Sequence, residues 1–527
     1  MAANIKRKIS WRNFWICFSI SLGQVAFGYP SSIIGTTLGQ PAFLLYMGLV
    51  TPEGNVTPHA TRYIGATSGV FQAGAFFGIL IGSWVMDKWG RKVGVIYCSV
   101  LSIIGGVMLC AAQSIGMFIA FRFFAGAGSW GYLGLIPVYT TELSPAESRG
   151  LFVGMNGVMI AVGYSIASYM GLAFFFSENP SLQWRGPLGL ALIWPIMMLI
   201  IIYFVPESPR WLLMKGRTEE AWQVISKLHY DPNDPDQEYS RGEFYQMQKQ
   251  TELDRTLNPT WKQMFMKPSY RKRVILGTGF AFLGQSTAVL VVNNYGPTLY
   301  RALGFGTRDQ LILQCGWVSC GIPSNLFGAW VMDRFGRRPL MLLGVAGCCI
   351  MICLEAAIVA EFAEAGTNKA ALGIGVAALY LFIIIYSMGV DVAGFVFFSE
   401  LFPNHIRAKG VAISIMVFSL TDLVYLQVAA EAFANIGWKF YLVFICIMAV
   451  GLVWGYLAIP ETKGVTLEEM AAIFGDDDDI VVYMKDIHVD HQTNELVVDQ
   501  QRNTTGPSGV VLERHDSKPD AIEIATR

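Results

Sequence analysis

Charged residues are scarce in this sequence. Asp, Glu, Lys and Arg make up 15% of its 527 residues, while 53% are hydrophobic. Soluble globular proteins carry about 25% charged residues, so the deficit excludes an ordinary soluble domain and predicts a chain embedded in lipid. The net charge of -1 also argues against a nucleic-acid partner, which requires a basic surface.

Histidines and metal-ligand patterns are also lacking. All six His residues fall between or beyond the apolar stretches, so no histidine relay for protons is expected inside the membrane. The nine Cys residues lie in or beside apolar stretches without metal-ligand spacing to His, and we interpret them as packing residues. The sequence has no Ser-His-Asp set, phosphate-binding loop or dinucleotide motif. This excludes an enzyme and an ATP-driven pump, and no metal or cofactor is expected.

Twelve apolar stretches of membrane-spanning length are present. A helix needs about 20 apolar residues to cross a hydrocarbon core of about 30 Å. The predicted spans are 13–33, 63–86, 93–113, 116–139, 151–173, 188–205, 274–296, 310–332, 340–360, 372–398, 410–432 and 438–459. A basic segment precedes the first stretch, as in a signal peptide. That stretch is a full span long and lacks a small-x-small cleavage site, so we interpret it as the first transmembrane helix.

Polar segments divide the chain into five parts. These are an N-terminal segment (1–12), a six-helix bundle (13–205), a linker with short helices (206–272), a second six-helix bundle (273–460) and a tail (461–527). The tail contains the acidic run Asp476–Asp479 and is predicted to be mostly disordered. The predicted fold class is an all-α integral membrane protein with two six-helix halves and a short helical domain between them.

The distribution of Lys and Arg predicts the orientation. The loops that contain Arg91, Arg149, Arg337 and Arg407 are richer in bases than the alternate loops, which places both termini and the linker in the cytosol. Asn55 then lies in the first outer loop, within an Asn-Val-Thr sequon. It is the one glycosylation site that we expect to be used.

A nine-residue block occurs twice in the chain. WVMDKWGRK at Trp84–Lys92 returns as WVMDRFGRR at Trp330–Arg338, each time between two apolar stretches. The Gly permits a tight bend between two helices, and the bases stay at the cytosolic surface. Two similar halves built from hydrophobic helices are the internal symmetry of many secondary transporters.

Acids and bases recur at matched positions around these blocks. Such residues at helix ends on one membrane face can form ion pairs that hold this face shut and that rehydrate when it opens. The alternative is that they serve only topology and surface solvation. The candidate cytoplasmic gate comprises Asp87, Arg91, Glu142, Arg149 and Glu207 in the first half and Asp333, Arg337, Glu400, Arg407 and Glu461 in the second.

Several motifs resemble one family of carriers. The repeated blocks are similar to the loops between spans 2–3 and 8–9 of the major facilitator superfamily. PVYTTELSPAESRG, PESPRWLLMKGR and PETKG, which begin at Pro137, Pro206 and Pro460, resemble its sugar porter family, and GQSTAVLVVNNYGPTLYRALGF at Gly284–Phe305 resembles fungal members. The resemblance implies twelve spans that alternate access around a sugar site at the midplane. We expect a monomer in the plasma membrane.

The resemblance also implies substrate-binding residues, and here the sequence departs from the family. Sugar sites need amide, hydroxyl and aromatic side chains. Of the paired Gln usual in the seventh span only Gln285 remains, and Leu290 replaces the usual Asn. A bulkier, glycosidic or non-sugar substrate is therefore plausible. The candidate solute contacts are Phe27, Asn156, Gln285, Asn293, Asn294, Tyr295, Asp391 and Phe395.

The residues expected for proton coupling are incomplete. Proton-coupled members of the family carry an Asp after Phe-Gly-Tyr in the first span, near an Arg in the fourth. Here Pro30 stands at the Asp position, while Arg122 is retained. Three other acids, Glu355, Asp391 and Asp422, fall within predicted spans, where a charge is costly and needs a reason. Glu355 is expected on an outer supporting helix, with a carboxyl that stays protonated or hydrogen-bonded to a neighbouring helix. The coupling candidates are Arg122, Asp391 and Asp422, and both passive diffusion and proton symport stay open.

The leading hypothesis is a secondary transporter for a sugar or a related polyhydroxylated solute, working by alternating access. Its partners would be that solute, the lipid bilayer and, in the symport case, protons. A carrier for a glycoside or secondary metabolite on the same scaffold is one alternative. A nutrient sensor that does not transport is another, although such sensors usually have a much longer cytosolic tail.

Overall fold

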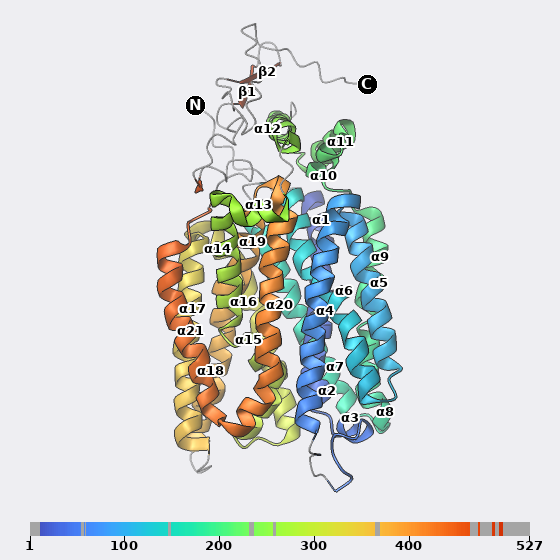
Figure 1. Ribbon diagram of the computed structural model, residues 1–527, viewed down its shortest axis with the longest axis vertical. Helices are drawn as coiled ribbons and strands as arrows, with labels where there is room; N and C mark the ends of the chain where they lie inside the picture. The colour runs from blue at the N-terminus through green and yellow to red at the C-terminus, as the bar shows by residue number, and fades with distance from the viewer. Residues whose placement is uncertain are drawn as a thin grey trace.

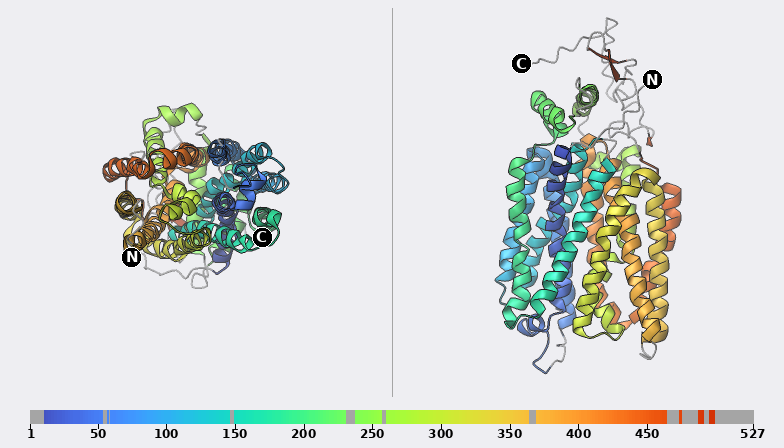
Figure 2. Two further views of the ribbon diagram at one scale, coloured as in Figure 1. Left: turned by 90° about the horizontal axis from the view of Figure 1, so that it is seen from below. Right: turned by 180° about the vertical axis from the view of Figure 1, so that it is seen from behind.

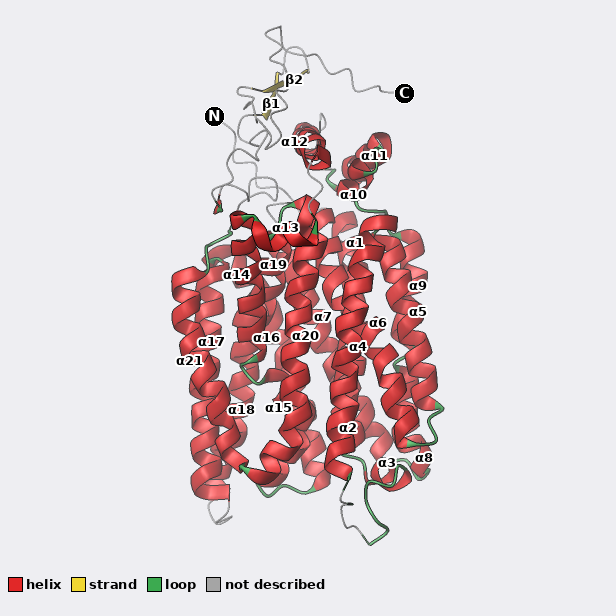
Figure 3. Cartoon of the chain, viewed as in Figure 1, coloured by secondary structure: helices red, strands yellow, loops and turns green. Residues whose placement is uncertain are grey.

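The computed structural model describes residues 11–53, 57, 59–145, 149–230, 237–256, 260–363, 369–463, 473–474, 487–490 and 495–498. Nearly all of them are helical, and most helices run side by side along the long axis of the molecule (Figures 1 and 3). The helices of the first half lie on one side and those of the second half on the other (Figure 2). The predicted fold class is confirmed.

The first half contains six spanning segments. The first is interrupted at Leu22, which separates α1 from α2, and the sixth is interrupted between α8 and α9. The elements are α1 (Trp11–Ser21), α2 (Gly23–Leu38), α3 (Pro41–Tyr46), α4 (Ala60–Trp89), α5 (Arg91–Cys110), α6 (Ile115–Leu143), α7 (Arg149–Phe175), α8 (Pro180–Leu190) and α9 (Ile193–Phe204). Asn55, the predicted glycosylation site, lies outside the described residues.

The second half repeats this plan with more interruptions. Its elements are α14 (Pro268–Gln285), α15 (Val289–Ala302), α16 (Thr307–Phe335), α17 (Arg337–Ile358), the π-helical turn η2 (Val359–Ala363), α18 (Lys369–Tyr386), the π-helical turn η3 (Ser387–Asp391), α19 (Val392–Leu401), α20 (Asn404–Asn435), the 3-10 turn η4 (Gly437–Lys439) and α21 (Phe440–Ala458). Two of the interruptions shape the centre. Ala288, with a left-handed φ of 74°, separates α14 from α15, and η3 separates α18 from α19.

Short helices join the two halves at one end of the bundle. They are α10 (Pro209–Met214), α11 (Thr218–Leu228), α12 (Glu238–Thr256) and α13 (Trp261–Met266). We call the end that carries α10–α13 the linker end, and the opposite end, which carries α3 and α8, the far end (Figure 1).

Two strands lie in the tail segment that the sequence predicts to be mostly disordered. β1 (Ile487–Asp490) pairs antiparallel with β2 (Glu495–Val498), with Ile487 opposite Val498. Apolar residues alternate with polar ones in β1, which is the pattern of a strand with one covered face. The acidic run 476–479 lies outside the described residues.

Nine helical segments of the described chain are long and apolar enough to cross a membrane. Without water in the hydrocarbon core, the backbone must satisfy its own hydrogen bonds, which an α-helix does. Three further helical segments pack within the same bundle. They are the α1–α2 pair, α6, which contacts α4 and α5, and α16, which contacts α7. Together the nine and these three agree with the twelve predicted spans.

Candidate functional site

A cavity lies between the two halves, midway along the bundle. The empty space between its lining residues, which includes space open to solvent, is about 530 Å³. The first half supplies Phe27, Leu133, Ile160, Ala161 and Tyr164, and the second half supplies Gln285, Val289, Leu290, Trp317, Val318, Gly321, Asn325, Ile383, Tyr386, Ser387, Asp391, Phe395 and Phe418. Apolar and aromatic side chains dominate this lining, so a few polar groups must give it its chemistry.

Gln285 and Asp422 form one polar pair of the site. With its amide nitrogen toward α20, Gln285 donates to Oδ1 of Asp422 at 2.8 Å and to Oδ2 at 3.1 Å. This amide orientation is assigned from the hydrogen bonds, because the reverse would set the amide oxygen against the carboxylate. Asp422 is 2% exposed and does not line the cavity, so it acts there through Gln285.

Asp391 forms a second polar centre of the cavity. It is the last residue of η3, and the Asn325 amide of α16 lies beside its carboxylate. Tyr164 and Tyr386 both interact electrostatically with Asp391 and with Asp422, which places the four side chains around the same space. None of the lining residues, all of which the structure describes, is Lys, Arg or His.

The structure brings together half of the predicted solute contacts. Phe27, Gln285, Asp391 and Phe395 line the cavity. Asn156 does not, because its amide nitrogen donates to Thr140 Oγ1 at 3.0 Å and to the Val153 carbonyl at 2.7 Å.

The other three predicted contacts lie on α15, outside the cavity lining. Asn293 accepts from Ser32 Oγ at 3.4 Å and from Gln314 Nε2 at 3.3 Å. The Tyr295 hydroxyl donates to the Leu426 carbonyl at 2.9 Å, and the backbone of Asn294 lies against Gly35. These contacts join α15 to helices of both halves near the far end.

Sequence reasoning missed several residues of the cavity. Tyr164, Trp317, Asn325 and Tyr386 line it but fall in spans where no motif points to them. One signal was available for Asn325, since an amide in the middle of a spanning helix requires a partner inside the protein.

Arg122 is buried near the far end without an acidic partner in the described chain. Its guanidinium donates to the carbonyls of Thr67 at 3.2 Å and Pro30 at 3.3 Å and lies 4.0 Å from the centre of the Phe71 ring. The carbonyl of Pro30 thus contacts Arg122 where the family's Asp would stand.

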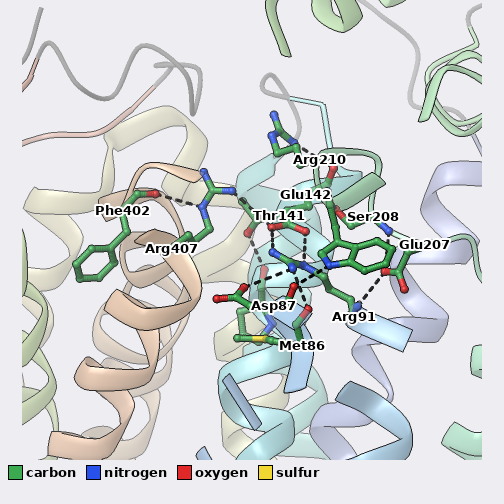
Figure 4. Close-up of polar contacts among 12 residues, drawn as sticks. Met86, Asp87, Arg91, Thr141, Glu142, Glu207, Ser208, Arg210, Phe402 and Arg407 are labelled. Carbon is green, nitrogen blue, oxygen red and sulfur yellow. Dashed lines mark hydrogen bonds and ion pairs between the residues drawn. The ribbon is translucent and has the colours of Figure 1, made fainter. Parts of the chain in front are cut away.

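A buried ion-pair network closes the linker end of the first half (Figure 4). Arg91 Nε and Nη2 donate to the two carboxylate oxygens of Glu142 at 2.8 and 2.7 Å, and Arg91 Nη1 lies 3.7 Å from Asp87. Arg210 donates to the Glu142 carbonyl at 3.1 Å, and the Trp211 indole donates to the Asp87 carbonyl at 3.0 Å. A two-pronged guanidinium–carboxylate contact fixes both side chains in orientation.

The second half repeats the network in looser form. Arg337 Nη2 donates to Glu400 at 3.2 Å, and the Thr462 hydroxyl donates to the other Glu400 oxygen at 2.9 Å. Asp333, the counterpart of Asp87, lies on α16, and its side chain lies outside the described part of the structure.

In both halves a Glu caps the helix that follows the repeated block. Glu207 accepts from the backbone nitrogens of Arg91 at 3.0 Å and Lys92 at 3.2 Å. Glu461 accepts from the backbone nitrogens of Arg337 at 2.9 Å and Arg338 at 3.1 Å. A carboxylate at this position satisfies free N–H groups and the positive end of the helix dipole.

The glycines of the repeated blocks make these caps possible. Gly90 has a φ of 105° and Gly336 a φ of 96°, which side chains rarely adopt. A Cβ atom would stand 2.4 Å from the Glu207 carboxylate in one case and 2.4 Å from that of Glu461 in the other.

Two charge pairs cross between the halves at the linker end. Arg407 of α20 lies 3.7 Å from Glu142 of α6, and Arg149 of α7 interacts electrostatically with Glu400 of α19. Each half therefore supplies the base for an acid of the other. Together with the contacts of α15, these pairs hold the two halves against each other on either side of the cavity.

Comparison with known proteins identifies the family. Residues 16–474 match the family of sugar (and other) transporters. The chain belongs to this family. Its members are carriers and not enzymes, and the chain is accordingly a multi-pass membrane transporter of the major facilitator superfamily.

Relatives within the sugar (and other) transporter family share most of the chain. The MFS-type transporter criB of Aspergillus cristatus is 30% identical over 452 residues, which cover 85% of this chain and 90% of criB. The high-affinity glucose transporter of Kluyveromyces lactis is 26% identical over 479 residues, covering 88% and 85%. Among solved structures, the proton:xylose symporter XylE bound to 6-bromo-6-deoxy-D-glucose has a TM-score of 0.76 at 23% identity, covering 89% of this chain and 100% of XylE. That last likeness shows the shared fold.

Proposed function

We propose that this protein carries a sugar or a related polyhydroxylated solute across the membrane by alternating access around the cavity. The observation that carries the proposal is a cavity between two similar halves, closed toward the linker end by ion pairs and toward the far end by α15. Glucose, quinate and xylose carriers are among the proteins that resemble this chain. Amide, hydroxyl and aromatic groups in the lining suit a solute with many hydroxyls.

The linker-end network is the gate in this proposal. Opening the linker end separates Arg407 from Glu142 and Arg149 from Glu400, while Arg91 and Arg337 keep their partners within each half. The separated charges then face the open aqueous path and regain water, so the change is less costly than exposing them to lipid.

A glycoside or secondary metabolite is the second candidate. Six aromatic residues line the cavity: Phe27, Tyr164, Trp317, Tyr386, Phe395 and Phe418. Such walls favour a solute with a large apolar surface, and more of them are present than a free hexose needs.

The proposed orientation places the linker end in the cytosol, with both termini there and the protein in the plasma membrane as a monomer. The basic loops of the repeated blocks lie at this end, in accordance with the preference of Lys and Arg for the cytosolic side. In this orientation Asn55 is lumenal and becomes glycosylated. Glycosidase treatment then shifts the mobility of the protein, and Asn55→Gln abolishes the shift; a shift that survives in the variant would contradict the orientation.

We propose facilitated diffusion as the energetic mode. Pro30 cannot titrate, and Arg122 contacts backbone carbonyls and an aromatic ring instead of a carboxylate. The proton carrier of coupled family members is therefore missing.

Uptake of a panel of radiolabelled sugars, polyols and glycosides tests the function. The host is a cell line without hexose carriers of its own, and the matched control is the Glu142→Gln variant, in which the gate is broken. Saturable uptake of at least one polyhydroxylated solute is the expected result. A protein that reaches the cell surface and moves none of them would contradict the proposal.

A further inference from the structure

The charged groups in and behind the cavity wall are acids without a base among them. Asp391 lines the wall, and Asp422 stands directly behind Gln285. No Lys, Arg or His belongs to the described lining, so nothing in this wall balances the two acids. A carboxylate in such surroundings needs a proton or a cation beside it.

The amides that face the cavity add acceptors to this imbalance. Because the Gln285 nitrogen is committed to Asp422, its amide oxygen is the group left for a solute. Asn325 is 0% exposed and lines the cavity, yet neither its oxygen nor its nitrogen has a hydrogen bond of good geometry, although the amide lies beside Asp391. Such a buried amide is costly unless a ligand completes its bonding.

The aromatic walls suit a cation as well. Phe27 of the first half and Phe418 of the second both contact the Trp130 ring, at centroid distances of 5.2 and 5.5 Å, so aromatic surface continues from one half to the other. Tyr164 and Tyr386 stand next to the two acids. Ring faces attract ammonium groups, most strongly where water is excluded.

We propose that the preferred solute carries a protonated amine on its polyhydroxylated or glycosidic body, and that Asp391 receives this amine. The Gln285 and Asn325 oxygens accept its remaining N–H bonds, while the aromatic rings cover the rest of the solute. This inference rests on the proposed function and narrows its substrate class. It gives both unpartnered features of the cavity, the unbalanced acid and the unsatisfied amide, one common explanation.

Matched solutes test the inference on the purified full-length chain in liposomes. The pairs are glucosamine against glucose and 2-aminoethyl β-D-glucoside against 2-hydroxyethyl β-D-glucoside, measured below the pKa of the amines. An amine that bonds to a carboxylate should be preferred in each pair by about tenfold or more in KM. The Asp391→Asn variant should lose this preference.

Glu355→Gln is the matched control, because Glu355 is a buried acid of α17 that does not line the cavity. It should leave the preference unchanged, and thermal unfolding verifies that each variant is folded. If Asp391→Asn does not fold, the preference of the unaltered protein for the amine member of each pair still tests the inference.

Each of the other outcomes contradicts one specific claim. Equal transport of both members of each pair overturns the amine inference and leaves the proposed function standing. Uphill accumulation of a neutral solute that requires a proton gradient and is lost in Asp391→Asn also overturns it, since Asp391 would then carry a proton. Transport of neither member of either pair overturns this inference, and the proposed function falls with it only if the wider panel of sugars, polyols and glycosides is not transported either.

Discussion

In the first half, Glu142 holds Arg91 through two hydrogen bonds of 2.7 and 2.8 Å; in the second half, Glu400 holds Arg337 through one of 3.2 Å. The helix caps differ less, since Glu207 and Glu461 each accept from two successive backbone nitrogens at 2.9 to 3.2 Å. The cavity differs most, because Tyr164 is the one polar residue that the first half adds to its described lining.

This contrast separates what the repeat preserves from what it does not. Each cap depends on the backbone and Gly of the block and on one Glu outside it, and both halves keep all three. The polar groups of the cavity depend on single side chains, which one half can supply alone. The first half therefore holds the tighter ion pair, and the second half supplies most of the polar groups of the cavity.

The largest expected effect comes from removing the Glu142 charge. Glu142→Gln leaves Arg91 and Arg407 buried without their shared counter-charge, and breaking a buried pair in this way costs about 3–5 kcal/mol. Glu400→Gln also removes the counter-charge of Arg149 but should cost less, because Arg337 reaches Glu400 through a single hydrogen bond that the amide oxygen can still accept. The melting temperatures of the two purified variants measure the difference. Equal losses would show that the two gates are equally strong.

Removing a solute contact should have the next largest effect. Gln285→Ala deletes the amide oxygen that faces the cavity, and an unpaired solute hydroxyl or amine costs about 1–3 kcal/mol, which weakens apparent affinity at least several-fold. Surface expression should not change. Asn294→Ala is the comparison, since Asn294 lies outside the lining. Unaltered transport kinetics in Gln285→Ala would remove this residue from the site.

A comparable effect, equal in the two halves, is expected at the two glycines. An Ala at Gly90 or Gly336 must adopt a positive φ with an extended ψ, which costs about 1–3 kcal/mol, and its Cβ must displace the capping carboxylate. Gly116→Ala is the control, because a Cβ there meets nothing within 4 Å. Thermal unfolding of the three variants tests the symmetry of the caps. A large difference between Gly90→Ala and Gly336→Ala would show that the caps are not equivalent.

The smallest effect is expected from collapsing the proton gradient. With facilitated diffusion, a protonophore leaves both the initial rate and the final level of a neutral solute unchanged, because no titrating group replaces the missing Asp at Pro30. Uptake with and without the protonophore, in the unaltered protein and in Asp391→Asn, is the measurement. Uphill accumulation that the protonophore abolishes would contradict diffusion, and its loss in Asp391→Asn would assign the coupling to that acid.

The long apolar runs and the repeated block were enough to predict the fold. The predicted span 63–86, for example, lies within α4, and the confirmed family follows from motifs at the helix ends. These features are local in the sequence, so no knowledge of distant contacts was needed. The matched acids and bases of the gate were also accessible, because the repeat aligns them.

The cavity was less accessible from sequence. Gln285 and Asp391 were expected, but the bond between Gln285 and Asp422 joins residues far apart in the chain, and only the packing of α14 against α20 reveals it. Asn293 and Tyr295 look like solute ligands from their chemistry. Their hydrogen bonds in the structure serve helix contacts instead.

The π-helical turn η3 gives the tenth span one more residue than a regular helix of the same rise would hold. An α-helix advances about 100° per residue, and the wider turn absorbs its extra residue locally, so the segments before and after it keep the orientation of a regular helix that is one residue shorter. Tyr386 before the turn and Phe395 after it therefore face the same space. If the same residues formed a regular α-helix instead, the two segments would turn relative to each other by about 100°, so the lining of the pocket depends on this one turn staying wide.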